Sequence, residues 1–419
     1  MDYAKRFRQD YTTSKARGQC RKRESLLLAN VRCEWYHMHM ETVKKRKKNI
    51  FLVCPAAHIA AIISAAVILA HLALRHNRGL MAKLSETVVR PAHRALALFW
   101  SHIGFSAAEC LIALFAVTMI AYIIYKLIRI VRGGDRLRQA YSALMTLAAA
   151  GLSVYALFCV LWGVYYYGDD FETMSGIRAE KISTQQLELV TRFFAARLNE
   201  YGEAVRKDEN GLYAVTADEL IEKSPEVFSV TEERFVCLEG PDIAVKGVHF
   251  SRVMSYLDFT GFFFPFTAEA NVNTDCPTSS LPATIAHELS HQRGVAKEQE
   301  ANFTAVMACL DYGDTDYCYS ACRLAYIHLG NALYGEDREA WAEIYSGLSD
   351  FVKRDLKTES EYWKQFETPV QTASNAVYEG FLQSYDQELG LKSYGACVDL
   401  LVCYYETQAA EYLENIEIK

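Results

Sequence analysis

The chain has 419 residues, with 44 Lys and Arg against 51 Asp and Glu and a net charge of −7 at pH 7. This length suffices for two or three domains. The acidic balance excludes nucleic acid as an expected partner, because no basic, aromatic-rich patch offsets it. None of the 12 cysteines forms a CxxC pair, so a cysteine-type zinc site is not expected either.

Residues 1–48 are polar and basic, which indicates a cytoplasmic tail, and Met40 is an alternative start within it. The next 26 residues, 49–74, contain no Lys, Arg, Asp or Glu. A cleavable signal peptide would have a shorter apolar core of about 7–15 residues. We therefore predict a first membrane-spanning helix over about 50–74.

Two further apolar runs, about 106–130 and about 140–162, predict two more spans, so that residues 49–164 form a membrane region. The alternative for these two is a buried helix hairpin of a soluble domain, but their lengths and the preceding span favour the lipid bilayer as partner. A transporter is disfavoured, because the spans carry few ionisable groups, namely His58, His71 and Glu109.

Lysines and arginines predict the orientation. Five of them, Lys44–Lys48, precede the first span, and five more lie in or beside the loop between spans two and three. Both groups fall on the same side of a three-span chain and outnumber the five after span one, so that side is predicted to be cytoplasmic. The N-terminus is then inside, in the cell membrane, and residues 165–419 are extracytoplasmic.

Residues 165–419 have the length and pattern of one helix-rich α+β domain. An amphipathic helix is expected from about Ser183, short strands at 244–251 and 261–273, and almost only helix after residue 316. The segment 261–273 either lines a cleft and pairs with a peptide backbone, or is a plain core strand.

The motif of greatest chemical content is "HELSH", residues 287–291. His287 and His291 are four residues apart, so on a helix both imidazoles share one face and can bind one Zn²⁺. Glu288 lies beside the first histidine, where it can act as general base on a metal-activated water. Ser280 is placed to cap this helix at its start, and Gly294 to end it.

The third metal ligand is expected from the helix that follows the turn at Gly294. Glu298 and Glu300 are the candidates, and they point in opposite directions because they are two residues apart. We favour Glu298, since it places Asn302 one turn later on the same face, where an amide can hydrogen-bond a ligand histidine. Glu300 is then a surface or ion-paired carboxylate.

Three segments, "FPFTAEANVN", "LPATIAHELSHQRGVAKEQEANF" and "GLKSYGACVDLL", resemble the bacterial family called domain of unknown function 3810. That family is similar to zinc metallopeptidases of the zincin type, which implies a zincin-like domain. The spacing of Glu298 and Asn302 also resembles the gluzincin pattern ExxxD. This resemblance implies that Glu298 is the third ligand, and that Asn302 replaces the aspartate that supports a histidine.

The sequence therefore predicts a membrane-anchored zinc metallopeptidase that hydrolyses peptide or protein substrates. The alternative is a non-catalytic, zinc-stabilised membrane protein that binds or senses a partner. A donor to the oxyanion is expected from a small set of residues near the end of the chain or on the helix after residue 316. They are Tyr394, His328, Tyr326 and Arg323.

Overall fold

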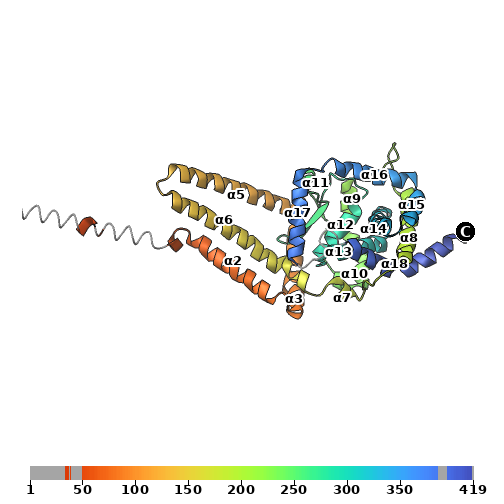
Figure 1. Ribbon diagram of the computed structural model, residues 1–419, viewed down its shortest axis with the longest axis horizontal. Helices are drawn as coiled ribbons and strands as arrows, with labels where there is room; N and C mark the ends of the chain where they lie inside the picture. Colours follow the sequence, from red (N-terminus) through yellow and green to blue (C-terminus); the bar gives the residue numbers. More distant parts are fainter. Residues whose placement is uncertain (1–33, 37, 39–49, 386–393, 418–419) are drawn as a thin grey trace, which may run out of the picture. The chain divides into compact units, whose positions relative to one another are not determined.

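The computed structural model describes residues 34–36, 38, 50–385 and 394–417. The fold is helix-rich, with one small sheet (Figure 1). Its contacts divide the chain into two compact units. Unit 1 comprises residues 1–63 and 125–151, and unit 2 comprises residues 64–124 and 152–419.

Three helices are long and apolar enough to cross a membrane, as the apolar runs predict. They are α2 (Pro55–Leu74), α5 (Ala107–Arg132) and α6 (Arg136–Phe158). A π-helical turn, η3 (Cys159–Gly163), extends α6, so its apolar segment covers 28 residues. The basic residues at 44–48 that support the predicted orientation lie outside the described part of the chain.

Unit 1 contains the first half of α2, the end of α5 and the start of α6. His58 of α2 hydrogen-bonds the Tyr141 hydroxyl of α6 through Nε2 at 2.7 Å. Lys126 of α5 donates to the Ser142 hydroxyl at 2.9 Å. Polar groups between apolar helices are thus paired within this unit, as a low-dielectric surrounding requires.

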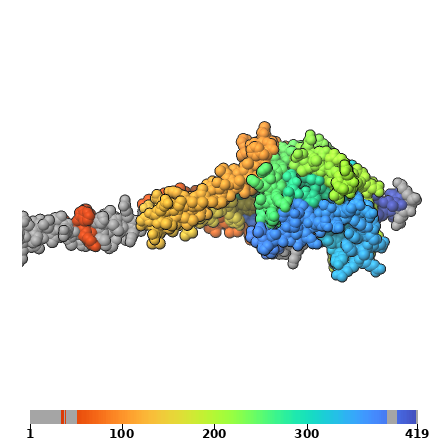
Figure 2. Space-filling model, turned by 90° about the horizontal axis from the view of Figure 1, so that it is seen from above, coloured from red at the N-terminus to blue at the C-terminus, as the bar shows by residue number. Residues whose placement is uncertain are grey.

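Unit 2 contains the other halves of these helices together with the whole domain that follows them. Between α2 and α5 the chain forms α3 (Arg78–Leu84), the π-helical turn η2 (Ser85–Val89) and α4 (Arg90–Ser101). In the space-filling view this orange segment lies against green residues of the domain (Figure 2). Arg90 donates to the Cys237 carbonyl at 2.8 Å and Arg94 pairs with Glu239 at 3.1 Å.

The remaining helices of unit 2 follow in chain order and confirm the helix-rich prediction. They are α7 (Phe171–Ser175), α8 (Thr184–Ala204), α9 (Ala217–Lys223), α10 (Ser229–Arg234), α11 (Ser251–Tyr256), α12 (Leu281–Gln292), α13 (Glu298–Tyr312), α14 (Thr315–Glu336), α15 (Arg338–Ser346), α16 (Asp350–Lys364), α17 (Pro369–Ser384) and α18 (Tyr394–Glu417). Helix α8 begins as predicted, because Ser183 and Gln186 form a reciprocal capping box.

The sheet has three short strands, β1 (Lys246–Gly247), β2 (Gly261–Phe264) and β3 (Glu269–Val272), in the order β1-β3-β2. Strand β1 pairs parallel to β3, and β2 pairs antiparallel to it. The prediction of one strand over 261–273 was wrong, because the chain reverses between β2 and β3. Pro265 cannot donate to a ladder, and Ala268 has φ of 55°, so this part turns.

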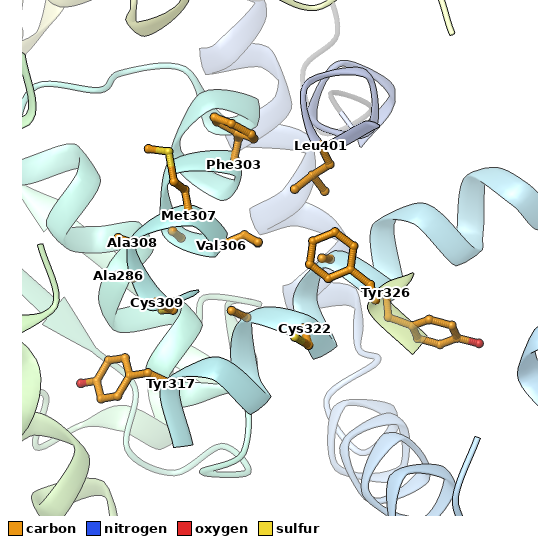
Figure 3. Packing of buried hydrophobic residues seen from close by; sticks show 14 of the residues in the cluster. Ala286, Phe303, Val306, Met307, Ala308, Cys309, Tyr317, Cys322, Tyr326 and Leu401 are labelled. Atoms are coloured by element: carbon orange, nitrogen blue, oxygen red, sulfur yellow. The ribbon is translucent and has the colours of Figure 1, made fainter. Parts of the chain in front are cut away.

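The core of unit 2 lies where α13 and α14 pack on α8, α12 and α18. Figure 3 shows Phe303 and Met307 of α13, with Leu401 of α18 nearby. These side chains are at most 1% exposed, which accounts for the apolar character of α13 beyond its first turn. Helix α13 thus packs against α12, α14 and α18 around this core.

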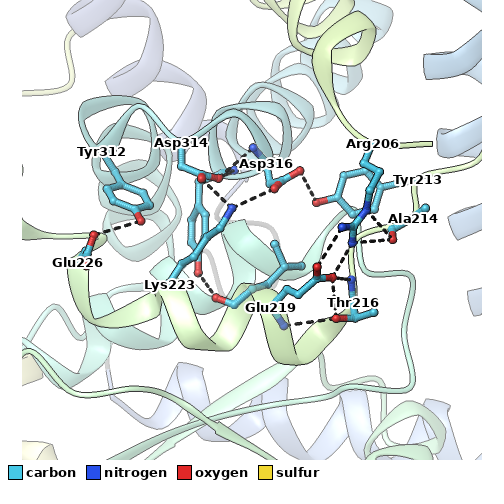
Figure 4. Close-up of polar contacts among 12 residues, drawn as sticks. Arg206, Tyr213, Ala214, Thr216, Glu219, Lys223, Glu226, Tyr312, Asp314 and Asp316 are labelled. Carbon is cyan, nitrogen blue, oxygen red and sulfur yellow. Dashed lines mark hydrogen bonds and ion pairs between the residues drawn. The ribbon is translucent and has the colours of Figure 1, made fainter. Parts of the chain in front are cut away.

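One surface of unit 2 carries a network of ion pairs (Figure 4). Lys223 of α9 pairs with Asp314 at 2.7 Å and with Asp316 at 3.2 Å, at the start of α14. Arg206 pairs with Glu219, whose carboxylate also caps α9. Charges in this network compensate one another, and partly exposed pairs contribute only about 0–1 kcal/mol each.

Candidate metal centre

Helix α12 carries the HExxH residues, and a tight turn follows it. Gly294 has φ of 90°, a conformation that side chains with a Cβ rarely adopt. A Cβ at this position would also lie 2.9 Å from the ring of Tyr165. Ser280 stands at the start of α12, but its hydroxyl donates to the Pro277 carbonyl and caps no amide, unlike the prediction.

The turn brings His287, His291 and Glu298 together. The Nε2 atoms of the two histidines are 3.0 Å apart. Glu298, the first residue of α13, places Oε2 3.2 Å from Nε2 of His287 and Oε1 3.7 Å from Nε2 of His291. The potential ligand atoms of these three residues all lie within 4.8 Å of one another.

The other nitrogen of each imidazole is held by a neighbour. Nδ1 of His287 lies 2.9 Å from Oδ1 of Asn302, and Nδ1 of His291 lies 2.7 Å from the Val295 carbonyl. Because both neighbours are acceptors, each Nδ1 carries a proton, and Nε2 is the nitrogen that a neutral imidazole would offer to a metal. Although burial lowers the pKa of His291, the charge of Glu298 beside it raises the value to about 9. Asn302 lies where the predicted register of α13 places it.

This arrangement fits a tetrahedral metal ion. Zinc binds imidazole nitrogen and carboxylate oxygen at about 2.0–2.2 Å, and the edge of such a tetrahedron is about 3.3 Å. The two Nε2 atoms are 3.0 Å apart and Oε2 of Glu298 is 3.2 Å from Nε2 of His287, both close to that edge, and one ligand atom from each of the three residues lies within 4.8 Å of the others. Two neutral imidazoles and one carboxylate are also the donor set of many catalytic zinc sites, which leave a fourth position for water or substrate.

Glu298 and Glu300 have different surroundings. Although burial raises the pKa of Glu298, the two histidines beside it hold that pKa well below its usual value. Glu300 points away from them: it accepts from the Phe171 amide at 2.9 Å and lies 3.4 Å from the Lys297 ammonium. Burial raises the pKa of Glu300 to about 7. Of the two carboxylates, only that of Glu298 joins the histidine pair.

Glu288 lies beside the donor atoms without being one of them. Its side chain is buried, and its Oε2 has no hydrogen-bond partner among the residues that the structure describes. Burial raises its pKa to about 7. A Cβ on Gly261 of β2 would lie 2.6 Å from Oε1 of Glu288, so only glycine permits the strand to pass so close to this carboxylate.

Two tyrosines at the site were missed by the sequence analysis. Tyr378 of α17 donates its hydroxyl hydrogen to Oε1 of Glu298 at 2.8 Å, and Tyr166 accepts from the Trp162 indole at 3.2 Å. Burial, reinforced by the charge of Glu298, raises the pKa of Tyr378, which keeps its hydroxyl protonated. Tyr378 is 80 residues from Glu298, and no local spacing pattern reports such a contact.

The donor atoms lie in a cleft of about 650 Å³, which we call the site cleft. Its walls come from β2 and the segment before it, from α12–α14, from α17 and from the end of the third apolar helix. The lining residues include Phe158, Trp162, Tyr166, Phe259, Gly261, Phe262, Phe263, His287, Glu288, His291, Glu298, Asn302, Arg323, Leu324, Ile327, Tyr378 and Phe381.

The predicted oxyanion donors do not gather in the site cleft. Arg323 lines it, but its guanidinium is held by the carboxylates of Asp355, at 2.9 Å, and Glu359. His328 and Tyr326 are buried in α14 outside the lining, and burial lowers the pKa of His328 to about 4. The side chain of Tyr394 lies outside the described residues.

Comparison with known proteins identifies a family. The family described as "Protein of unknown function (DUF3810)" matches residues 85–402, which include the second and third apolar helices and the whole site cleft. No curated protein and no solved structure matches the chain. Since the match covers most of its length, the chain belongs to the DUF3810 family.

Proposed function

We propose that this protein is a membrane-anchored, zinc-dependent metallopeptidase with a zincin-like domain. His287, His291 and Glu298 would hold the Zn²⁺, because their potential ligand atoms all lie within 4.8 Å of one another. When bound, zinc supplies a Lewis acid that polarises a carbonyl and lowers the pKa of water.

The observation that carries this proposal is the position of Glu288: its carboxylate lines the site cleft beside the three potential ligands, is buried, and has at Oε2 no hydrogen-bond partner among the described residues. A metal site that only stabilises a fold needs no such group, and an unsatisfied buried polar atom costs about 1–3 kcal/mol. Burial raises the pKa of this carboxyl group and so favours its protonated form, which suits a group that accepts a proton from water. Glu288 takes a proton from the attacking water at Oε2 and passes it to the departing amine.

Strand β2 offers a place for the substrate backbone. It is an edge strand, because the sheet order is β1-β3-β2, and its residues Gly261–Phe263 line the site cleft. An extended peptide can add to such an edge through main-chain hydrogen bonds, with alternate side chains entering the cleft. This placement would bring a peptide carbonyl beside Glu288, since Gly261 lies in contact with that carboxylate.

Tyr378 and Asn302 position the ligands in this proposal. The Tyr378 hydroxyl fixes Oε1 of Glu298, and Oδ1 of Asn302 orients the ring of His287. The excess of basic residues on one side of the three apolar helices favours a cytoplasmic N-terminus and a site cleft outside the cytoplasm.

The experiment is peptide cleavage by the full-length, zinc-loaded protein and its Glu288→Gln variant. The substitution keeps the shape and removes the base, so we expect unchanged zinc content and a loss of cleavage of about 10²–10⁴-fold. Glu300→Gln is the matched control, because this buried carboxylate lies on the far side of α13 and should leave cleavage intact. If the zinc-loaded parent cleaves no peptide in a broad library, the non-catalytic alternative replaces this proposal.

Zinc content tests the ligand assignment separately. Glu298→Ala should release the metal, whereas Glu300→Ala should retain it. Asn302→Ala should weaken zinc binding by about 10–100-fold, because it frees the ring of His287. If Glu298→Ala retained its zinc, the third ligand would be another residue.

A further inference from the structure

A membrane-spanning helix forms part of the wall of the site cleft. The third apolar segment runs to Gly163, and its residues Phe158 and Trp162 line the cleft together with the donor atoms. The ring centroid of Trp162 is 5.8 Å from that of His291. A single side-chain contact thus separates the end of this span from a proposed zinc ligand.

The depth of this contact follows from the length of the helix. An α-helix rises 1.5 Å per residue, so about 20 residues cross the 30 Å hydrocarbon core. The third apolar segment has 28 residues, so its ends reach the headgroup region. Trp and Tyr favour that depth, and Trp162 and Tyr165–Tyr167 lie at this end. The site cleft therefore lies at the surface of the bilayer.

Helix α17, the opposite wall, extends to the same depth. Phe381 lines the cleft and contacts Phe158, with ring centroids 5.4 Å apart. One turn beyond, the Tyr385 hydroxyl is 3.7 Å from Sγ of Cys159. Val370 and Val377 on the outside of α17 are 55% and 74% exposed, as expected of a helix that borders lipid.

The interior of the cleft suits apolar side chains. Phe259, Phe262 and Phe263 line it on the β2 side, and Leu324 and Ile327 line it on the α14 side. Soluble, polar peptides would leave much of this apolar surface unmatched. The segments of a membrane protein that flank its spans are enriched in Trp and Tyr, whose rings suit such a surface.

We propose that the substrates are polypeptides anchored in the same membrane, cut in an extended segment within a few residues of their own apolar anchor. This inference rests on the proposed peptidase activity and names its substrate class. An extended chain advances about 3.3–3.6 Å per residue. A substrate that leaves the bilayer beside the third span would therefore reach His291 within a few residues.

The test uses full-length, zinc-loaded protein in liposomes and a reporter with one transmembrane helix followed by several identical copies of an apolar, cleavable segment. A flexible tether alone lowers the effective concentration of distant copies only gradually, roughly as the −3/2 power of tether length. We expect cleavage to fall off more sharply with distance than a tether alone predicts, so that only the copy nearest the anchor is cut. Insertion of a rigid folded domain between anchor and copies should abolish cleavage, and Glu288→Gln controls for other proteases.

The outcomes separate the two proposals. Similar cutting of all copies, undiminished cutting beyond the folded spacer, or equal cutting of an anchor-free reporter would overturn the inference and leave the peptidase proposal standing. Failure of the zinc-loaded parent to cut any reporter, anchored or soluble, would instead refute the peptidase activity itself.

Discussion

The second and third apolar helices contact the domain through different kinds of interaction. At the start of α5, the buried carboxylate of Glu269 accepts from the amides of Ala107, at 3.2 Å, and Ala108, at 2.7 Å. At the end of the third helix, Trp162 packs its ring against Phe263, with centroids 5.0 Å apart, and beside His291. The first attachment is polar, and the second is largely aromatic.

The two attachments therefore have different roles, because only the second lies in the site cleft. The attachment at α5 satisfies the free amides of a helix N-terminus with a negative charge, which is favourable at that end of the helix dipole. Glu269 does not line the site cleft, whereas Trp162 does. The α5 contact therefore supports strand β3, and the third helix contributes directly to the cleft.

The largest expected effect is at the aromatic attachment. Truncation of Trp162 to Ala removes a ring that is 6% exposed and leaves a cavity beside His291, at a cost of about 3–5 kcal/mol. Thermal unfolding of the full-length protein in detergent measures this. Trp162→Phe keeps a ring and should lose less than half as much. A loss in Trp162→Ala below about 1 kcal/mol would contradict tight packing at this end.

The polar attachment should respond to loss of its acceptor. Glu269→Ala leaves three buried donors unpaired, the two amides of α5 and the Thr267 hydroxyl, and should cost about 3 kcal/mol in the same measurement. Glu269→Gln keeps one acceptor oxygen and should cost about 1–2 kcal/mol. Equal losses in both variants would show that negative charge, rather than hydrogen bonding, fastens α5.

The smallest expected effect is a pH dependence of the free energy of unfolding, caused by an ion pair of Asp170, which follows the third helix in the chain. Lys297 lies 2.6 Å from Asp170. Although burial raises the pKa of Asp170, hydrogen bonds from Lys297 and Thr173 outweigh it and lower the value from 3.8 to about 2. The pair therefore stabilises the fold above about pH 4, and about 2 kcal/mol is lost as pH falls toward 2.

Asp170→Asn isolates this contribution, because other carboxylates also take up protons in acid. The free energy of unfolding of the variant should lie below that of the parent at neutral pH, and the two should converge near pH 2. If the free energies of unfolding of the parent and the variant fell in parallel as the pH was lowered, the Asp170–Lys297 pair would add no stability.

Several features were predictable because they depend on neighbours in the chain. Long apolar runs predicted all three membrane-length helices, since few charged residues can be placed in a hydrocarbon core cheaply. The four-residue spacing of His287 and His291 placed both imidazoles on one face of α12, because α-helical geometry is regular. Gly294 marked the turn, since few other residues adopt its positive φ.

The prediction over 261–273 failed for a physical reason that the pattern could not show. An apolar, β-prone stretch favours extended structure, but it does not report where a chain reverses. The reversal places Glu269 beside α5 and Gly261 against Glu288, and both contacts are made by residues distant in the sequence.

By itself the sequence determined the apolar helices, the face shared by the two histidines and the turn that follows them, because each depends on residues within a few positions of one another. Only the tertiary structure decided that Glu298 joins the histidines while Glu300 pairs with Lys297, that Tyr378 donates to Glu298, and that Trp162 borders the cleft. The contacts of Tyr378 and Trp162 join segments 80 and about 130 residues apart, and they form only when helices pack around a common core.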